Sequence, residues 1–262
     1  QKTLQLIGQT GIPIVNCTNA CATGATAFRE GWMSIKAGIH DVVLVSGVEK
    51  MGTGLLGGDT GELGIPLEGL IGSQTMPAIF AEAGMEHARN HGTSFEQFAK
   101  ISVKNHHHST MNPKSRYQIE TPLKEVMESE MIAYPNTKLM CSANVDGSAA
   151  AVLVSEKKAK EYGMSRAIKV KASVLTSDPY DDRNLAMPNI NTLTKNAATQ
   201  AYEMAGLGPE DLDLVELHDC FASAEMLHYG NLGLCKDEDA GRYVDEGRFE
   251  IGGIMPVNLS GG

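Results

Sequence analysis

The sequence has no long hydrophobic run. None of its apolar stretches reaches the roughly 18 residues that a membrane helix needs, and its first residues lack the basic and apolar blocks of a signal peptide. Basic residues are also in the minority, with 22 Lys and Arg against 32 Asp and Glu and a formal net charge of −10. Such a charge disfavours nucleic acid and anionic lipid as partners. We therefore expect no membrane span and no nucleic-acid partner.

Cysteine pairs of the CxxC type are also absent. The chain has five cysteines, an odd number, at positions 17, 21, 141, 220 and 235. This usage fits a reducing compartment better than a disulfide framework, so we expect a cytoplasmic location. With 262 residues and 42% hydrophobic residues, the chain can bury the core of one large or two moderate domains.

The hydrophobic pattern predicts an α/β protein. Apolar runs at 12–16 and 41–47 flank a stretch with helical spacing, which predicts a parallel strand–helix–strand unit. Residues 51–76 are rich in glycine and interrupt this pattern. Further strands are predicted at 149–155, 167–176 and 212–221, and helices at 21–38, 76–90, 94–106, 123–130, 195–205 and 222–230.

Two cysteines lie in the stretch NCTNACATGATAF, residues 16–28. Cys21 lies where the predicted helix begins, and unpaired N–H groups at a helix start favour the thiolate form of a cysteine. Small neighbours would let a thioester approach the sulfur closely. Cys17 is on the strand side, where we expect a packing residue. From these residues alone, Cys21 is either a nucleophile or a small buried hydrophobic residue.

A second group of reactive side chains is His218, Asp219 and Cys220, at the end of an apolar segment. Strand alternation would place His218 and Cys220 on one side and Asp219 on the other. A histidine and a thiol there can donate a hydrogen bond to a developing oxyanion and move a proton. The alternatives are a histidine bonded to backbone and a zinc site shared with Cys21, which lacks a fourth ligand at the usual spacing.

Two further motifs have simpler explanations. GTGLLG at 52–57 matches GxGxxG, but no helix pattern follows it, so we expect no dinucleotide site there. The run His106–His108 invites a metal interpretation, but consecutive side chains point in different directions. We expect a solvated or substrate-facing loop at these histidines and predict no metal.

Several phrases together resemble the thiolase superfamily, in the branch of the sterol carrier protein-type thiolases. They are NACATGATAF, GIHDVVLVSGVEKM, FAKISVKNHHHS, CSANVDGSAAAVLVSE, VELHDCFA and NLSGG. The resemblance covers almost the whole chain, and HDCF is the phrase specific to that branch. It implies a layered α/β thiolase fold of two β-α-β-α-β-β halves, with a loop domain inserted in the first. The implied boundaries are 1–51 with 141–163 for the N-terminal half, 52–140 for the loop domain and 164–262 for the C-terminal half.

The resemblance also implies a role for each candidate residue. Cys21 would carry the acyl group as a covalent thioester, His218 would bind the thioester oxygen, and Cys220 would be the acid/base at the α-carbon. The implied function is a CoA-dependent thiolase that cleaves or forms a 3-oxoacyl-CoA, with coenzyme A as co-substrate and no permanently bound cofactor. The alternative is a non-catalytic acyl-CoA-binding or scaffold subunit, which would have no use for these three residues together. A decarboxylating condensing enzyme on the same fold fits the HDC phrase poorly.

Partners and chain ends follow from the resemblance as well. It implies acyl-CoA and CoA as ligands and a homodimer or higher homo-oligomer, and some relatives work with a small zinc-ribbon and OB-fold chain. In the family, NLSGG continues into a Gly-His-Pro phrase whose histidine activates the nucleophile. We therefore expect an internal fragment that lacks both ends of a longer enzyme. A peroxisomal targeting tripeptide would lie beyond Gly262, so the peroxisome stays open beside the cytoplasm.

Overall fold

The chain is divided into two compact units by its internal contacts. The computed structural model describes residues 2–8, 11–51, 76–177 and 190–262. The first unit comprises Gln1–Met51 and Asp146–Leu175, and the second comprises Gly52–Val145 and Thr176–Gly262. The three-part domain division expected from the sequence stays a prediction.

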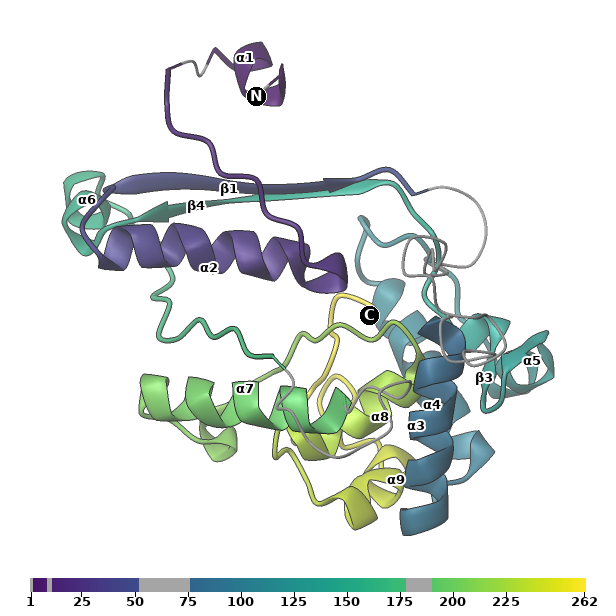
Figure 1. Cartoon of the computed structure of the whole chain (residues 1–262). Helices are drawn as coiled ribbons and strands as arrows, with labels where there is room; N and C mark the ends of the chain where they lie inside the picture. The colour runs from purple at the N-terminus through teal and green to yellow at the C-terminus, as the bar shows by residue number, and fades with distance from the viewer. Residues whose placement is uncertain (1, 9–10, 52–75, 178–189) are drawn as a thin grey trace, which may run out of the picture. The chain divides into compact units, whose positions relative to one another are not determined.

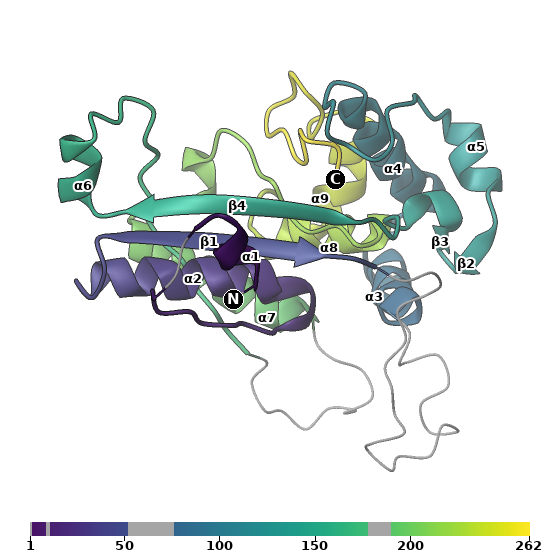
Figure 2. The ribbon, with the colours of Figure 1, turned by 90° about the horizontal axis from the view of Figure 1, so that it is seen from above.

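The first unit contains a two-stranded antiparallel sheet with a helix against it. β1 (Val42–Glu49) pairs with β4 (Gly147–Val154) along its whole length. α2 (Thr23–Lys36) runs along this sheet, as Figures 1 and 2 show. A Cβ on Gly31 would lie 2.9 Å from a methyl group of Val45, so only glycine lets the helix approach the strand this closely. The unit's short helices are α1 (Lys2–Leu6), η1 (Ala20–Ala22) and α6 (Glu156–Glu161).

The sequence-based expectations for this unit were partly wrong. The helix and the strands at 41–47 and 149–155 are confirmed, but β1 pairs antiparallel with β4 and forms no parallel pair within the described residues. Residues 12–16 and 167–176 lie outside regular secondary structure, and Val15 and Ile168 are 76% and 90% exposed. An apolar or alternating pattern describes one segment only, whereas a strand also needs a paired backbone.

The second unit is mainly helical and is built around α8 (Ala222–Asn231), most of which is buried. α8 packs against α3 (Met76–His91), α4 (Phe95–Ser109), α7 (Ile190–Ala205) and α9 (Asp237–Asp245). Tyr229 of α8 stacks on Phe249 with ring centroids 3.7 Å apart, at the centre of the hydrophobic core. The unit's smaller elements are α5 (Leu123–Glu128), β2 (Met131–Ala133), β3 (Asn136–Thr137), η3 (Lys138–Met140) and η4 (Pro209–Asp211).

α4 begins at a capping box and is longer than the sequence predicted. The Ser94 side chain accepts a hydrogen bond from the Gln97 N–H, and the Gln97 side chain accepts one from the Ser94 N–H. The helix continues to Ser109, so His106–His108 lie on its last turn. The expected loop at these histidines is therefore wrong, because helical packing extends one turn further.

The segment 212–221, predicted as a strand, forms isolated β-bridges and no continuous strand pairing with the residues that the structure describes. Single bridges join Val215 to Val257 and Cys141 to Phe221. Backbone hydrogen bonds from Asn258 N to Val215 O and from Ser142 N to Cys220 O support these two ends, at 2.8 and 3.0 Å. The segment is thus held at two points by chain that is distant in sequence. The GTGLLG motif at 52–57 lies outside the described residues.

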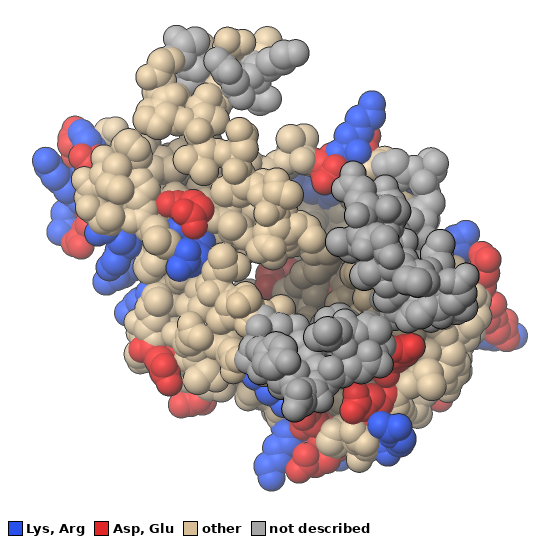
Figure 3. All heavy atoms as spheres, viewed as in Figure 1, with Lys and Arg blue, Asp and Glu red and all other residues tan. Residues whose placement is uncertain are grey.

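Charged side chains of both signs lie together on the second unit. Figure 3 shows them mixed around the end where α9 lies. Arg242 of α9 contacts both Asp239 and Glu246, at 2.7 and 3.0 Å. Among the helices that the structure describes, none is long and apolar enough to cross a membrane.

Candidate active site

Cys21 lies on the short turn η1, directly before α2, and is exposed. Ala20, the residue before it, has φ 42°, a left-handed backbone that residues with a Cβ rarely adopt. Thr23 fixes this turn, since its Oγ1 donates to Ala20 O and accepts from Asn19 N, both at 2.8 Å. The sulfur is therefore presented on a sharp turn that is built from neighbouring residues alone.

The other thiols have different surroundings. Burial raises the pKa of the Cys141 thiol to about 11. Burial, reinforced by Asp237, raises the pKa of Cys235 to about 12. Cys17, Cys141, Cys220 and Cys235 are all partly buried, which leaves Cys21 as the exposed thiol among the five. A buried thiol that holds its proton is a poor nucleophile at neutral pH.

His218 and Cys220 lie on the segment that precedes α8, in the second unit. His218 is exposed, yet partial desolvation lowers the pKa of its imidazole below the usual value. A neutral imidazole can both donate and accept a hydrogen bond. Cys220 is partly buried. Cys21 belongs to the first unit.

Asp219, between these two residues, is joined to a buried polar network. Asn105 Nδ2 on α4 donates to Asp219 Oδ2 and to Glu225 Oε2, each at 2.7 Å. Lys104 Nζ lies 2.7 Å from Glu225 Oε1, in a pair whose side chains are 5% and 0% exposed. Tyr229 OH and Asn258 Nδ2 also donate to Glu225, at 2.6 and 3.0 Å. The network connects α4, α8, the segment before α8 and the chain near Asn258.

Burial and negative charge in this network raise the pKa values of two residues, Asp219 and Tyr229. Burial first, and then the Glu225 charge, raise the pKa of Asp219 to about 8, against the opposing effects of Lys104 and Asn105. Burial and Glu225 also raise the pKa of Tyr229 well above its usual range. Low polarity disfavours every added negative charge here.

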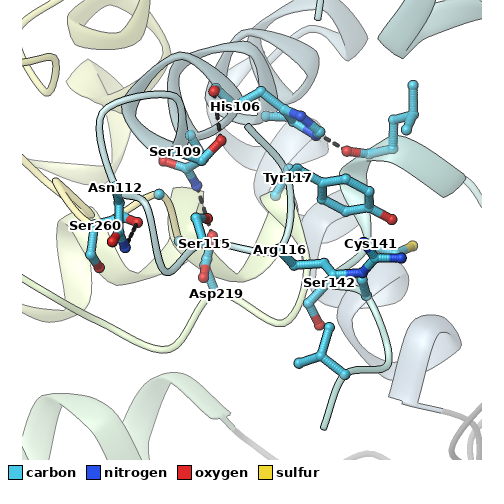
Figure 4. A pocket seen from close by; sticks show the side chains of 18 of the residues that line it. His106, Ser109, Asn112, Ser115, Arg116, Tyr117, Cys141, Ser142, Asp219 and Ser260 are labelled. Carbon is cyan, nitrogen blue, oxygen red and sulfur yellow. Dashed lines mark hydrogen bonds between the residues drawn. The ribbon is translucent and has the colours of Figure 1, made fainter. Parts of the chain in front are cut away.

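A cavity of about 330 Å³ opens beside Asp219 in the second unit. Figure 4 shows His106 and Tyr117 on one side of it and Asp219 and Ser260 on the other. The His106 and Tyr117 rings stack with centroids 5.4 Å apart, and burial lowers the pKa of His106. Neither His218 nor Cys220 lines this cavity.

Sequence reasoning missed Lys104, Asn105 and Glu225. The signal that could have found them is a charged or polar residue at an otherwise apolar helical position, as in ISVKNH and SAEML. No group of three or more His, Cys, Asp or Glu within the described ranges is arranged to hold a metal ion.

Comparisons with known proteins identify the family. Residues 182–262 match a family model described as Thiolase C-terminal domain-like. Sterol carrier protein 2 of Oryctolagus cuniculus is 40% identical over 98% of this chain and 49% of its own length. The acetyl-CoA acetyltransferase of Methanothermobacter thermautotrophicus is 36% identical over 97% of this chain and 67% of its own length. The chain belongs to the thiolase superfamily. The similarity to sterol carrier protein 2 confirms the expected branch.

Two more comparisons extend this result. The benzoylsuccinyl-CoA thiolase subunit BbsB of Thauera aromatica is 32% identical over 100% of this thiolase chain and 68% of its own length. A solved structure, the Ltp2-ChsH2(DUF35) aldolase, superposes with a TM-score of 0.74 and 23% identity, covering 91% of this chain and 64% of that one. The likeness confirms the expected α/β thiolase fold. The chain spans about half the length of the sterol carrier protein 2 relatives.

Proposed function

We propose that this thiolase chain carries acyl-transfer chemistry on CoA thioesters, with Cys21 as the nucleophile and coenzyme A as co-substrate. The names of its relatives support this chemistry, since they include an acetyl-CoA acetyltransferase and a benzoylsuccinyl-CoA thiolase subunit. The observation that carries the proposal is the exposed thiol of Cys21 on a strained turn at the start of α2. A buried packing cysteine would need neither that exposure nor that turn.

The proposed first step is acyl transfer to Cys21. The Cys21 thiolate attacks the carbonyl carbon of an acyl-CoA, the carbon–sulfur bond to CoA breaks, and CoA leaves as a thiolate that takes up the proton released when Cys21 ionised. His218 donates a hydrogen bond to the thioester oxygen as negative charge develops on it. The small residues next to Cys21, which are Ala20, Ala22 and Gly24, leave room for the thioester.

The proposed second step forms a carbon–carbon bond. Cys220 removes a proton from the α-carbon of a second acyl-CoA, and that carbon attacks the acyl group on Cys21. The Cys21 thiolate leaves, and the product is a 3-oxoacyl-CoA. Cleavage runs through the same steps in reverse, with CoA accepting the acyl group.

The second candidate is a non-catalytic acyl-CoA-binding or scaffold subunit, which the name sterol carrier protein 2 keeps open. A homo-oligomer and a zinc-ribbon and OB-fold accessory chain stay predictions from the resemblance. The experiment below separates the catalytic and the non-catalytic candidates.

Acyl transfer and carbon–carbon chemistry are tested by two cysteine variants. The protein is incubated with acetyl-CoA, and the acyl mass on each cysteine is mapped. Exchange of the acetyl methyl protons with heavy water is measured in parallel. Cys21→Ala should lose the acyl adduct, whereas Cys220→Ala should keep the adduct on Cys21 and lose the proton exchange.

Cys17→Ala is the matched control, because Cys17 is a partly buried cysteine on the same stretch of chain. It should keep both the adduct and the exchange. A folded parent protein that forms no adduct on Cys21 favours the non-catalytic candidate. A Cys220→Ala variant that exchanges protons at the parent rate makes Cys220 a packing residue.

A further inference from the structure

Two carboxylates and one cation share the buried network beside the HDC phrase. Asp219 and Glu225 both accept from the same nitrogen, Asn105 Nδ2, so their oxygens lie close together. The one ammonium group in contact with this pair among the described residues is Lys104, which is 5% exposed. Glu225 is fully buried and Asp219 is half-buried, so two negative charges against one positive charge leave a charge that water screens only in part, which is costly.

The hydrogen-bond donors show which carboxylate keeps the charge. Glu225 accepts from four side chains, namely Lys104, Asn105, Tyr229 and Asn258. Asp219 accepts from one side chain in the described part of the chain, Asn105, and from its own backbone N–H. A carboxylate surrounded by donors is stabilised as the anion, whereas a half-buried carboxylate with fewer donors, beside another negative charge, favours its proton.

We propose that Asp219 carries a proton at neutral pH and acts as a positioning residue, holding the backbone between His218 and Cys220 against α4 through Asn105. Asn105 also joins Glu225 and Lys104, so the segment before α8 is tied to the centre of the second unit. The role of the held segment rests on the proposed function, whereas the proton on Asp219 does not. The burial that raises the pKa of Asp219 agrees with the donor arrangement.

The proton on Asp219 predicts a specific dependence of stability on pH. In the unfolded chain Asp219 ionises near the ordinary value of 3.8, whereas in the folded chain it keeps its proton to about pH 8. Its contribution to stability is complete below pH 3.8 and is lost as the pH rises towards about 8. One proton changes the unfolding equilibrium constant by at most about tenfold per pH unit.

The test compares Asp219→Asn with the parent protein from pH 5 to 9.5 by denaturant unfolding. The asparagine side chain has the shape of a protonated aspartate and has no proton to lose. The unfolding constant of the parent, divided by that of Asp219→Asn, should therefore grow by up to about tenfold per pH unit and level off above pH 8. Asp213→Asn, which removes an exposed carboxylate from the same segment, is the matched control measured beside it. A flat ratio for Asp219→Asn overturns the proposal.

Other groups near Asp219 do not imitate this result. The remaining titratable residues that line the same cavity are His106, Lys114, Arg116, Tyr117 and Cys141. Each is present in both proteins, so its contribution cancels in the ratio of unfolding constants. His106 has a lowered pKa, and its own effect on stability has the opposite sign in the acidic range.

The positioning role is tested by rescue. At pH 7, Asp219→Ala should lower the heavy-water exchange of acetyl-CoA about tenfold, whereas Asp219→Asn should stay within about twofold of the parent. Equal losses in both folded variants overturn the role of a neutral Asp219. If the parent shows no exchange, the proposed function fails, while the unfolding measurements still decide whether Asp219 holds a proton.

Discussion

The turn at Cys21 and the segment at His218–Cys220 are built in opposite ways. The hydrogen bonds around Cys21 join residues at most seven positions apart, such as Asn19 and Thr26. The segment at Asp219 is held by Asn105, which is 114 positions away, and through it by Lys104 and Glu225. One candidate site is therefore local and exposed, and the other depends on the folded core of the second unit.

This difference predicts how each region responds to change. Substitutions near Cys21 should alter chemistry with little effect on stability, because few buried contacts depend on them. Substitutions in the network should alter stability first, because they leave charges or donors buried without partners. The predictions below test that contrast, from the largest expected effect to the smallest.

Removing the buried cation should give the largest effect. Lys104→Met leaves Glu225 charged and without a cationic partner in the core, which should lower the free energy of unfolding by about 3–5 kcal/mol. Denaturant unfolding at pH 7 measures this change. The expected magnitude is a large share of the stability of an ordinary domain.

Lys100→Met is the matched control, because Lys100 lies on the same helix and also has an ion pair. The side chains of Lys100 and Asp245 are 34% and 41% exposed, so this ion pair should contribute no more than about 1 kcal/mol to the free energy of unfolding. Similar losses for the two variants would show that burial of the Lys104–Glu225 pair does not matter, and the contrast between the two regions would fail.

Loss of His218 should give a kinetic effect with little change in stability. His218 is exposed, so His218→Ala should leave unfolding within about 0.5 kcal/mol of the parent. If His218 binds the thioester oxygen, turnover should fall roughly 10²-fold, as for the loss of one oxyanion donor. Steady-state rates with acetyl-CoA, measured beside unfolding, test both parts.

His107→Ala is a suitable comparison, since its side chain is 53% exposed and lies on α4. It should keep its turnover. A folded His218→Ala protein with parent turnover would make His218 a residue without a catalytic role, and the hydrogen-bond donor to the thioester oxygen would have to be another group.

The turn at Cys21 could be predicted from the sequence, whereas the segment at His218–Cys220 could be predicted only in part. The start of α2 next to Cys21 follows from helical spacing and small residues that are contiguous in the chain. The ladder expected at 212–221 was wrong, because alternation does not specify a partner strand. The setting of Asp219 depends on Asn105 and Glu225, and no local pattern brings distant polar residues together.

The smallest predicted effect concerns the partly buried thiols of the second unit. Raising the pKa of Cys141 from 9.0 to about 11 cuts its thiolate fraction about 100-fold at pH 7.5, whereas the more basic thiolate is roughly tenfold more nucleophilic towards a disulfide. Cys141 should therefore react with an aromatic disulfide reagent about tenfold more slowly than a thiol of ordinary pKa. Cys235, at about 12, should be slower still.

Cys21 should be modified first, because it is exposed and the other four thiols are partly buried. Mass mapping after brief treatment at pH 7.5 gives the order of reaction, and the same treatment in denaturant should bring all five cysteines to similar rates. Labelling of Cys141 before Cys21 in the folded protein would contradict the prediction. It would mean that access to the sulfur on the local turn is lower than to a thiol in the helical unit, which removes the main support for Cys21 as the nucleophile.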